Sequence, residues 1–170
     1  RPATNKRTPA GGAPTAPHNA AEADEARIDI AAVTDLLLGT WAATRREARE
    51  MIKDPAFWRV EGEPMDAHRE RTLGQLRLLA ERGASGRAYP KEYGGQANDG
   101  ANLAGFEELV LADPSMQIKG GVQWGLFGSA IHQLGTKKHW DKWLPGVIDL
   151  SLPGAFAMTE IGHGSDVAAA

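Results

Sequence analysis

The chain has 170 residues, of which 42% are hydrophobic and 24% charged, a composition typical of a globular protein. Its formal net charge is −3 and its positive charges form no stripe, so nucleic-acid binding is not expected. The lack of cysteine excludes disulfides and thiolate metal sites, and no run approaches the roughly 18 consecutive apolar residues of a membrane span.

Residues 1–23 are expected to form a tail without fixed structure. Prolines and glycines recur along it, and no acidic residue precedes Glu22. Basic stretches without acids also occur in organelle transit peptides. The prolines here would break the amphipathic helix that such a peptide needs, so a flexible tail is the better interpretation.

Residues 24–150 are expected to form an all-α domain, because segments of helical periodicity follow one another between Gly, Pro and capping residues. The pattern predicts helices over residues 29–38, 41–53, 64–83, 101–112, 113–134, and a short last helix between Thr136 and Pro145. Asp113-Pro114 and Thr136 are the clearest start signals, since each places a capping side chain before a helical pattern.

The helix over residues 113–134 is apolar on every side, which is typical of a helix buried by its neighbours. Val122, Leu126 and Ile131 are therefore expected to be almost inaccessible to solvent. Gly121, Gly125 and Gly128 would let another backbone or a ligand approach this helix closely.

Residues 157–169 read Ala-Met-Thr-Glu-Ile-Gly-His-Gly-Ser-Asp-Val-Ala-Ala. The apolar run over residues 155–158 would suit a buried strand, and the glycines around His163 allow the backbone to pass close to a bulky ligand. Thr159 and Ser165 supply hydroxyls, and free backbone N–H groups in such a loop can hold anionic or carbonyl oxygens. The pattern favours a loop that lies against a planar, phosphate-bearing cofactor.

This stretch resembles the flavin-contacting signature of the acyl-CoA dehydrogenase and acyl-CoA oxidase family, and its Gly-His-Gly looks more like the oxidases. Tyr89-Pro-Lys-Glu-Tyr-Gly-Gly95 resembles the family's Pro-x-x-Tyr-Gly-Gly turn. Leu134-Gly-Thr136 and Lys142-Trp-Leu-Pro145 resemble two further family passages. The resemblance implies a helical N-terminal domain, followed over residues 151–170 by the first strand and loop of a β-barrel domain.

The resemblance also implies the activity: oxidation of an acyl-CoA to trans-2-enoyl-CoA with FAD, as in fatty-acid β-oxidation, and with oxygen as acceptor in the oxidases. Carried over by position, the residues that would contact the flavin are Phe156, Met158, Thr159, Gly164 and Ser165. Ser165 would also contact the CoA part of the substrate.

Three residues of the fifth predicted helix, Gln123, Trp124 and Phe127, match the helix that lines the acyl pocket in relatives. Core packing is the alternative for Trp124 and Phe127, whereas a buried amide such as that of Gln123 must find hydrogen-bond partners. The family's catalytic base lies in a later domain, so no catalytic residue and no metal ligand is expected in this chain.

Two alternatives stay open: an acyl-CoA dehydrogenase that uses an electron-transfer partner, and a non-catalytic helical interaction module. We expect the chain to be the N-terminal part of a longer, homo-oligomeric protein and inactive by itself. Acyl-CoA is the expected partner, with no nucleic acid and no membrane span. The expected location is the cytoplasm, or the peroxisome in a eukaryote.

Overall fold

The computed structural model describes residues 28–159 and 161–162, and these residues form helices and turns without a strand. The chain falls into two units, residues 1–36 and 37–170. Most of α1 (Ile30–Leu38) belongs to the first unit. It begins after Asp29, whose carboxylate accepts hydrogen bonds from the backbone N–H groups of Ala31 and Ala32, both at 3.0 Å. The predicted tail over residues 1–23 lies outside the described residues.

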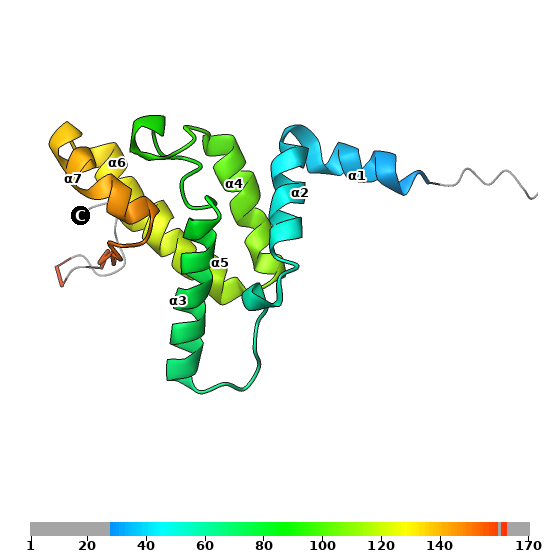
Figure 1. Ribbon diagram of the computed structural model, residues 1–170, viewed down its shortest axis with the longest axis horizontal. Helices are drawn as coiled ribbons and strands as arrows, with labels where there is room; N and C mark the ends of the chain where they lie inside the picture. Colours follow the sequence, from blue (N-terminus) through cyan, green and yellow to red (C-terminus); the bar gives the residue numbers. More distant parts are fainter. Residues whose placement is uncertain (1–27, 160, 163–170) are drawn as a thin grey trace, which may run out of the picture. The chain divides into compact units, whose positions relative to one another are not determined.

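The second unit is a bundle of helices joined by short 3₁₀ turns. Its elements are η2 (Gly39–Trp41), α2 (Ala42–Met51), η3 (Pro55–Phe57), α3 (Met65–Glu81), η4 (Lys91–Tyr93), α4 (Asp99–Glu108), η5 (Leu109–Leu111), α5 (Pro114–Gly120), η6 (Gly121–Gly128), α6 (Ser129–Leu134) and α7 (Lys137–Ile148). In Figure 1, α5, η6 and α6 follow one axis as a single long helix. Against it pack α3 at one end and α7 at the other, while α2 lies beside α4.

The helix starts follow from local capping chemistry. Asp113 accepts a hydrogen bond from the Ser115 backbone N–H at 2.9 Å, with Pro114 in the first turn of α5. Asn98 caps α4 in the same way through Ala101, and Thr136 forms a capping box at the start of α7. These side chains satisfy N–H groups that have no partner inside the helix. The predicted starts at Asp113 and Thr136 are confirmed.

The end predicted for the last helix is wrong, because α7 continues through Pro145 to Ile148. A proline inside a helix removes a hydrogen bond and costs about 3 kcal/mol. Here Leu144 and Val147 on either side of Pro145 are both fully buried. Their packing holds the last turn in helical form despite the proline.

The strand predicted over Ala155–Met158 is also not formed, since residues 153–159 have no regular secondary structure. A strand needs a neighbouring strand that pairs with its backbone. The described residues supply none, and Phe156 and Met158 are exposed rather than buried. The assignment of residues 151–170 to a β-barrel domain stays a prediction.

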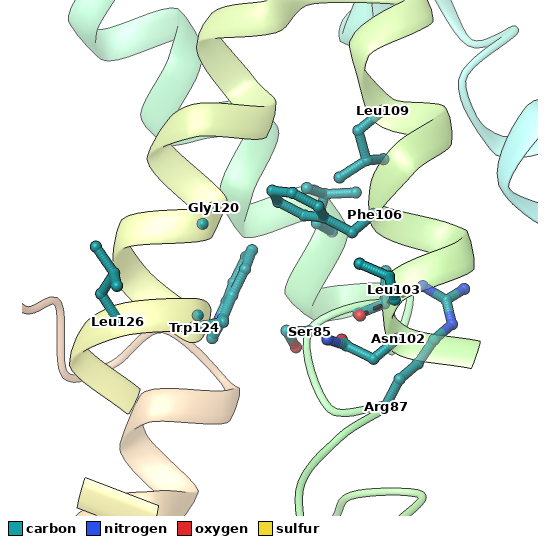
Figure 2. A pocket seen from close by; sticks show the side chains of 13 residues that line it. Ser85, Arg87, Asn102, Leu103, Phe106, Leu109, Gly120, Trp124 and Leu126 are labelled. Atoms are coloured by element: carbon teal, nitrogen blue, oxygen red, sulfur yellow. Dashed lines mark hydrogen bonds between the residues drawn. The ribbon is translucent and has the colours of Figure 1, made fainter. Parts of the chain in front are cut away.

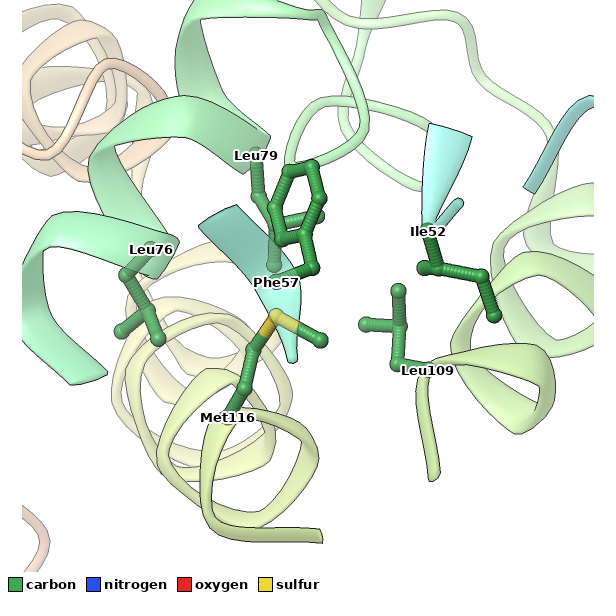
Figure 3. Packing of buried hydrophobic residues seen from close by; sticks show 6 residues of the cluster. All are labelled: Ile52, Phe57, Leu76, Leu79, Leu109 and Met116. Carbon is green, nitrogen blue, oxygen red and sulfur yellow. The ribbon is translucent and has the colours of Figure 1, made fainter. Parts of the chain in front are cut away.

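The larger core cluster joins the end of α2 to α3 and α5. Figure 3 shows its six buried side chains converging: Ile52, Phe57, Leu76, Leu79, Leu109 and Met116. A second cluster of Tyr89, Leu144 and Val147 lies under α7, and Trp124 packs against both clusters. Trp124 is therefore the link between the two halves of the bundle.

The burial predicted for the long helix is wrong. Leu126 is 42% exposed and Leu134 85%, while Val122 and Ile131 are only partly buried. The buried side of this helix instead carries residues such as Met116 and Gln123. An apolar surface all round indicates how much a helix would gain from burial, but the described neighbours cover one side only.

An arginine paired with a buried carboxylate ties α3 to the start of α5. Arg71 donates to Asp113 at 2.7 Å and approaches Glu63 at 2.6 Å, and Asp113 is completely buried. Burial disfavours the charged form of Asp113, but hydrogen bonds from Arg71 and the Ser115 backbone N–H outweigh it and hold its pKa below the ordinary value. The capping carboxylate of α5 is thus kept ionised.

A second ion cluster joins α2 to α4. Glu108 is buried and accepts hydrogen bonds from Arg49 at 2.7 Å and from Arg45 at 3.0 Å. Burial acts to raise the pKa of Glu108, but these two arginines lower it on balance. The buried carboxylate of Glu108 thus keeps its charge only because α2 supplies two arginines to it.

We expect Arg71→Met to lower the free energy of unfolding by about 3–5 kcal/mol at pH 7, because it leaves the buried Asp113 charge unpaired. The folded-state pKa of Asp113 is depressed, so the pair contributes fully above the unfolded pKa of about 4 and is lost as the pH falls through the folded value. The cost should therefore shrink in acid. Urea denaturation at several pH values measures it.

Arg69→Met is the matched control for that measurement, since Arg69 lies on the same helix and pairs with Asp66 at the surface. Exposed pairs contribute little, so this variant should unfold almost as the wild type does. Equal effects of the two substitutions would show that the Arg71 pair does not hold α3 to α5.

Candidate functional site

An apolar cavity of about 300 Å³ lies between α3, α4 and the long helix. Figure 2 shows Phe106 extending from α4 towards Gly120, with Trp124 rising from the long helix beside it. The side chains and glycines that line the cavity are Leu79, Ala84, Ser85, Arg87, Asn102, Leu103, Phe106, Leu109, Gly120, Gly121, Trp124, Gly125 and Leu126. Its size is at the lower end of small-molecule sites, and its walls suit an apolar chain.

The polar residues of the cavity wall are largely engaged elsewhere. Ser85 donates its hydroxyl to the Ile148 carbonyl at 2.8 Å. The guanidinium of Arg87 lies 3.5 Å from Glu47 on α2 and points away from the cavity in Figure 2. The space beside Phe106 and Trp124 is therefore bounded mainly by carbon.

The long helix changes form where it meets the cavity, because η6 (Gly121–Gly128) is π-helical. The buried Tyr89 donates its hydroxyl to the Trp124 carbonyl at 2.7 Å. Burial raises the pKa of Tyr89 well above its ordinary value, so the phenol keeps the proton that it donates. A side chain inserted into the hydrogen-bond ladder is a recognised cause of such distortion, and π turns are frequent at functional sites.

Gly128 makes the insertion of Tyr89 possible. Its φ is −65°, which any residue adopts, but a Cβ at this position would lie 2.0 Å from the Tyr89 hydroxyl oxygen. The close neighbour of Gly128 is a side chain, whereas the sequence predicted another backbone or a ligand, and a Cβ at Gly125 would meet nothing within 4 Å. Tyr89 was not among the predicted site residues, and its place before Pro90 in the turn motif was the only local signal for it.

The connector, which we define as Asp149–Gly154, leads from α7 to the predicted flavin-contacting segment. Gln123 donates to the Leu152 carbonyl at 3.0 Å and accepts from the Gly154 N–H at 2.8 Å. The ring of Phe127 occupies the space beside Gly154, where a Cβ would lie 2.0 Å from it. The buried amide of Gln123 has thus found its partners in the connector.

Of the three residues predicted to line an acyl pocket, Trp124 lines the cavity, whereas Gln123 and Phe127 contact the connector instead. Trp124 also donates its indole N–H to the Val147 carbonyl at 2.9 Å. The structure brings these three side chains together on one stretch of helix. Trp124 forms part of the cavity wall, and Gln123 and Phe127 hold the connector.

Among the residues predicted to contact a flavin, Phe156, Met158 and Thr159 are exposed and follow the connector directly. Gly164 and Ser165 lie outside the described residues, as does His163. An exposed phenylalanine and methionine offer flat and adaptable apolar surface, and a threonine hydroxyl can donate or accept. This set fits a ring system that has apolar faces and a polar edge.

Three glutamates of the bundle are paired with arginines or exposed to solvent. Glu107 and Glu108 pair with arginines of α2, and Glu92 is exposed. Across residues 28–159 and 161–162, no three His, Cys, Asp or Glu side chains are placed to hold a metal ion. None of the helices in this part of the chain is long and apolar enough to cross a membrane.

Residues 41–151 match the sequence family described as the acyl-CoA dehydrogenase N-terminal domain. The chain belongs to this family. It is 40% identical over 103 residues to the peroxisomal acyl-coenzyme A oxidase 3 of Arabidopsis thaliana, covering 61% of this chain and 15% of the relative. It is 48% identical over 61 residues to the acyl-coenzyme A oxidase-like protein of Mus musculus, covering 36% of this chain and 10% of that one.

The chain therefore spans between 10% and 15% of the length of these two relatives. Among solved structures, butyryl-CoA dehydrogenase from Megasphaera elsdenii has a similar fold, with a TM-score of 0.57 over 75% of this chain and 34% of that one. The two sequences are 20% identical, so this likeness shows the fold alone. It confirms the helical domain that the sequence motifs implied.

We expect Gly128→Ala to destabilise the protein by about 1–3 kcal/mol, because the added methyl would overlap the Tyr89 hydroxyl. Tyr89→Phe should cost about 0.5–1.5 kcal/mol through the lost hydrogen bond to Trp124. The double variant should cost less than the sum of the two, since a ring without its hydroxyl would leave room for part of the methyl. Denaturant unfolding of all four proteins measures the coupling.

Tyr93→Phe is the control, because Tyr93 stands in the same turn but donates to the exposed Asp141. It should show no coupling to Gly128→Ala. Additive costs for Tyr89→Phe and Gly128→Ala would contradict the insertion of the Tyr89 hydroxyl into the helix.

Proposed function

We propose that the complete protein is an FAD-dependent acyl-CoA oxidase that converts an acyl-CoA to trans-2-enoyl-CoA, with oxygen as electron acceptor, in fatty-acid β-oxidation. The observation that carries the proposal is the apolar cavity with Trp124 in its wall, next in sequence to Gln123, which bonds the connector to the flavin-contacting segment. Membership of the family and relatives named as acyl-CoA oxidases support it. The same relatives support a peroxisomal location in a eukaryote.

The acyl chain would enter the cavity between α4 and the long helix. Leu103, Phe106 and Trp124 would surround it with carbon and exclude water, so binding gains from the burial of apolar surface. Gln123 and Phe127 would not contact the acyl chain. They would hold the connector in position through Gly154. Acyl-CoA is thus the small-molecule partner that we propose for the complete protein.

FAD, when bound, supplies the acceptor for the hydride that leaves the substrate. Phe156 and Met158 would lie against its ring system, and the Thr159 hydroxyl would hydrogen-bond the polar edge. We propose Gly164 and Ser165 for the continuation of this contact on the sequence motif alone, with Ser165 also near the CoA portion. No residue of this chain is assigned the role of catalytic base.

The choice between an oxidase and a dehydrogenase rests on what reoxidises the flavin. The complete protein is reduced with palmitoyl-CoA without oxygen, and oxygen is then admitted while flavin absorbance and hydrogen peroxide are followed. Rapid reoxidation with stoichiometric peroxide is the expected result. A flavin that stays reduced until an electron-accepting dye is added would assign the dehydrogenase activity instead, and a protein without flavin would indicate a non-catalytic helical module.

We expect Gly125→Leu to raise the KM for long acyl-CoAs about tenfold or more, because the new side chain would fill space beside Trp124. A Cβ at Gly125 meets nothing within 4 Å, so the fold should tolerate the change. Initial rates over the series from butyryl-CoA to palmitoyl-CoA give the measurement.

Gly74→Leu is the matched control, since Gly74 is also helical, also open around a Cβ, and away from the cavity. Both substitutions raise helix propensity by a similar amount, so stability effects cancel in the comparison. Equal KM values for the Gly125 variant and the Gly74 variant would argue that the cavity takes no acyl chain.

We expect Thr159→Ala to weaken flavin binding by about 0.5–1.5 kcal/mol or to shift the flavin absorbance, because one hydroxyl bond is removed. Thr159→Ser keeps the hydroxyl and should behave as the wild type. Ser165→Ala should leave flavin content largely intact and mainly raise the KM for acyl-CoA. Wild-type spectra and kinetics in both alanine variants would remove the main support for a flavin site at residues 157–169.

A further inference from the structure

Both polar atoms of the Gln123 side chain form hydrogen bonds. Their partners lie at the end of α7 and in the connector. Its amide nitrogen donates to the Leu152 carbonyl at 3.0 Å and lies 3.5 Å from the Val147 carbonyl. Its amide oxygen accepts from the Gly154 N–H at 2.8 Å. With 4% of its surface exposed, this amide depends on the connector for its hydrogen bonds, as the connector depends on it.

Neighbouring side chains of the same helix hold the same stretch of chain from other sides. The Phe127 ring packs where Gly154 has no Cβ, and the Trp124 indole donates to the Val147 carbonyl at 2.9 Å. Within the connector, Leu150 has a φ of 63°, a conformation that a non-glycine residue keeps only where its surroundings impose it. The connector therefore has a single, defined path.

That path leads directly to the residues proposed to face the flavin. Phe156 follows Gly154 by two residues and Thr159 by five, so the position of Gly154 limits where both can lie. At the other side, Gln123 adjoins Trp124 in sequence, and Trp124 forms the cavity wall. One turn of helix thus determines where the acyl cavity and the flavin-contacting segment lie with respect to each other.

We propose that Gln123 is a positioning residue of the reaction, which acts through Gly154 to set Phe156, Met158 and Thr159 beside the acyl cavity. This inference rests on the proposed function and adds to it a residue that touches neither substrate nor flavin. A displacement of reacting groups by about 1 Å can cost on the order of a hundredfold in rate, so one such clamp is enough to affect turnover.

The test compares Gln123→Met with Gln117→Met in the complete protein. Both glutamines lie on the long helix and donate to a backbone carbonyl, but Gln117 donates to Phe106 on α4 at 3.2 Å and does not contact the connector. Methionine keeps the length of the side chain and removes its hydrogen bonds in both variants. Hydrogen–deuterium exchange, the visible flavin spectrum, and kcat and KM with palmitoyl-CoA are measured for each.

In Gln123→Met, the amides of Leu152 and Gly154 should exchange roughly five- to tenfold faster, because Gly154 loses its hydrogen-bond acceptor and Leu152 loses the donor to its carbonyl, while the helices keep their protection. The flavin absorbance should shift, and kcat should fall about tenfold or more with little change in KM. Gln117→Met should leave all these properties unchanged. If Gln123→Met loses its helical circular dichroism, Phe127→Leu replaces it, because Phe127 acts on Gly154 from a second side.

Wild-type exchange at the Leu152 and Gly154 amides in Gln123→Met would overturn the proposal. So would faster exchange with an unchanged flavin spectrum and kcat, since Gln123 would then only stabilise the connector. A wild-type protein that binds no FAD would overturn the proposed function, and the role of Gln123 with it. An FAD-loaded wild type with an unresponsive Gln123→Met variant overturns the role of Gln123 alone.

Discussion

The hydrogen bond from the Tyr89 hydroxyl to the Trp124 carbonyl decides the form of the long helix on which the candidate site is built. It inserts a side chain from the turn before η4 into the ladder of that helix, where residues 121–128 are π-helical. Trp124 faces the cavity, while Gln123 and Phe127, four residues apart on one side of the helix, face the connector. The bond is buried, so neither partner can exchange it for water without opening the second core cluster.

Two ion clusters, each built on a buried carboxylate, join the helices that form the cavity walls. Arg71 joins α3 to the cap of α5 through Asp113, and Glu108 joins α4 to α2 through two arginines. Ion pairs of this kind offset their desolvation without adding much stability, but they tolerate only a narrow geometry. Stability comes mainly from the apolar clusters, whereas each ion cluster joins two helices at one defined point. A cavity of about 300 Å³ between α3, α4 and α5 stays open under both constraints.

The family match and the predicted flavin contacts cover different parts of the chain. The family match covers residues 41–151, which contain the cavity, the π turn and the first part of the connector. The predicted flavin contacts begin after that region, at Phe156, where the described chain has no regular structure. The part of the site that the structure describes is therefore the cavity and the clamp at Gln123. The flavin side rests on the motif and on the exposed set of Phe156, Met158 and Thr159.

The helical class, the family and the helix starts could be predicted from local sequence, because caps and periodicity act within a few residues. Asp113 bonds Ser115 two positions away, and such a signal is complete in a short stretch of chain. Gln123 could also be recognised as a residue that needed partners, although not as one that would find them in the connector.

The remaining features required the folded chain, since each depends on partners far along the sequence. Tyr89 and Trp124 are 35 residues apart, and Gln123 and Gly154 are 31 apart. No local pattern states that a hydroxyl will enter a helix ladder, or that Leu144 and Val147 will be buried deeply enough to carry α7 past Pro145. The all-round apolar pattern of residues 113–134 likewise could not say which side would be covered. These features are decided by packing between distant segments, which forms only when the chain folds.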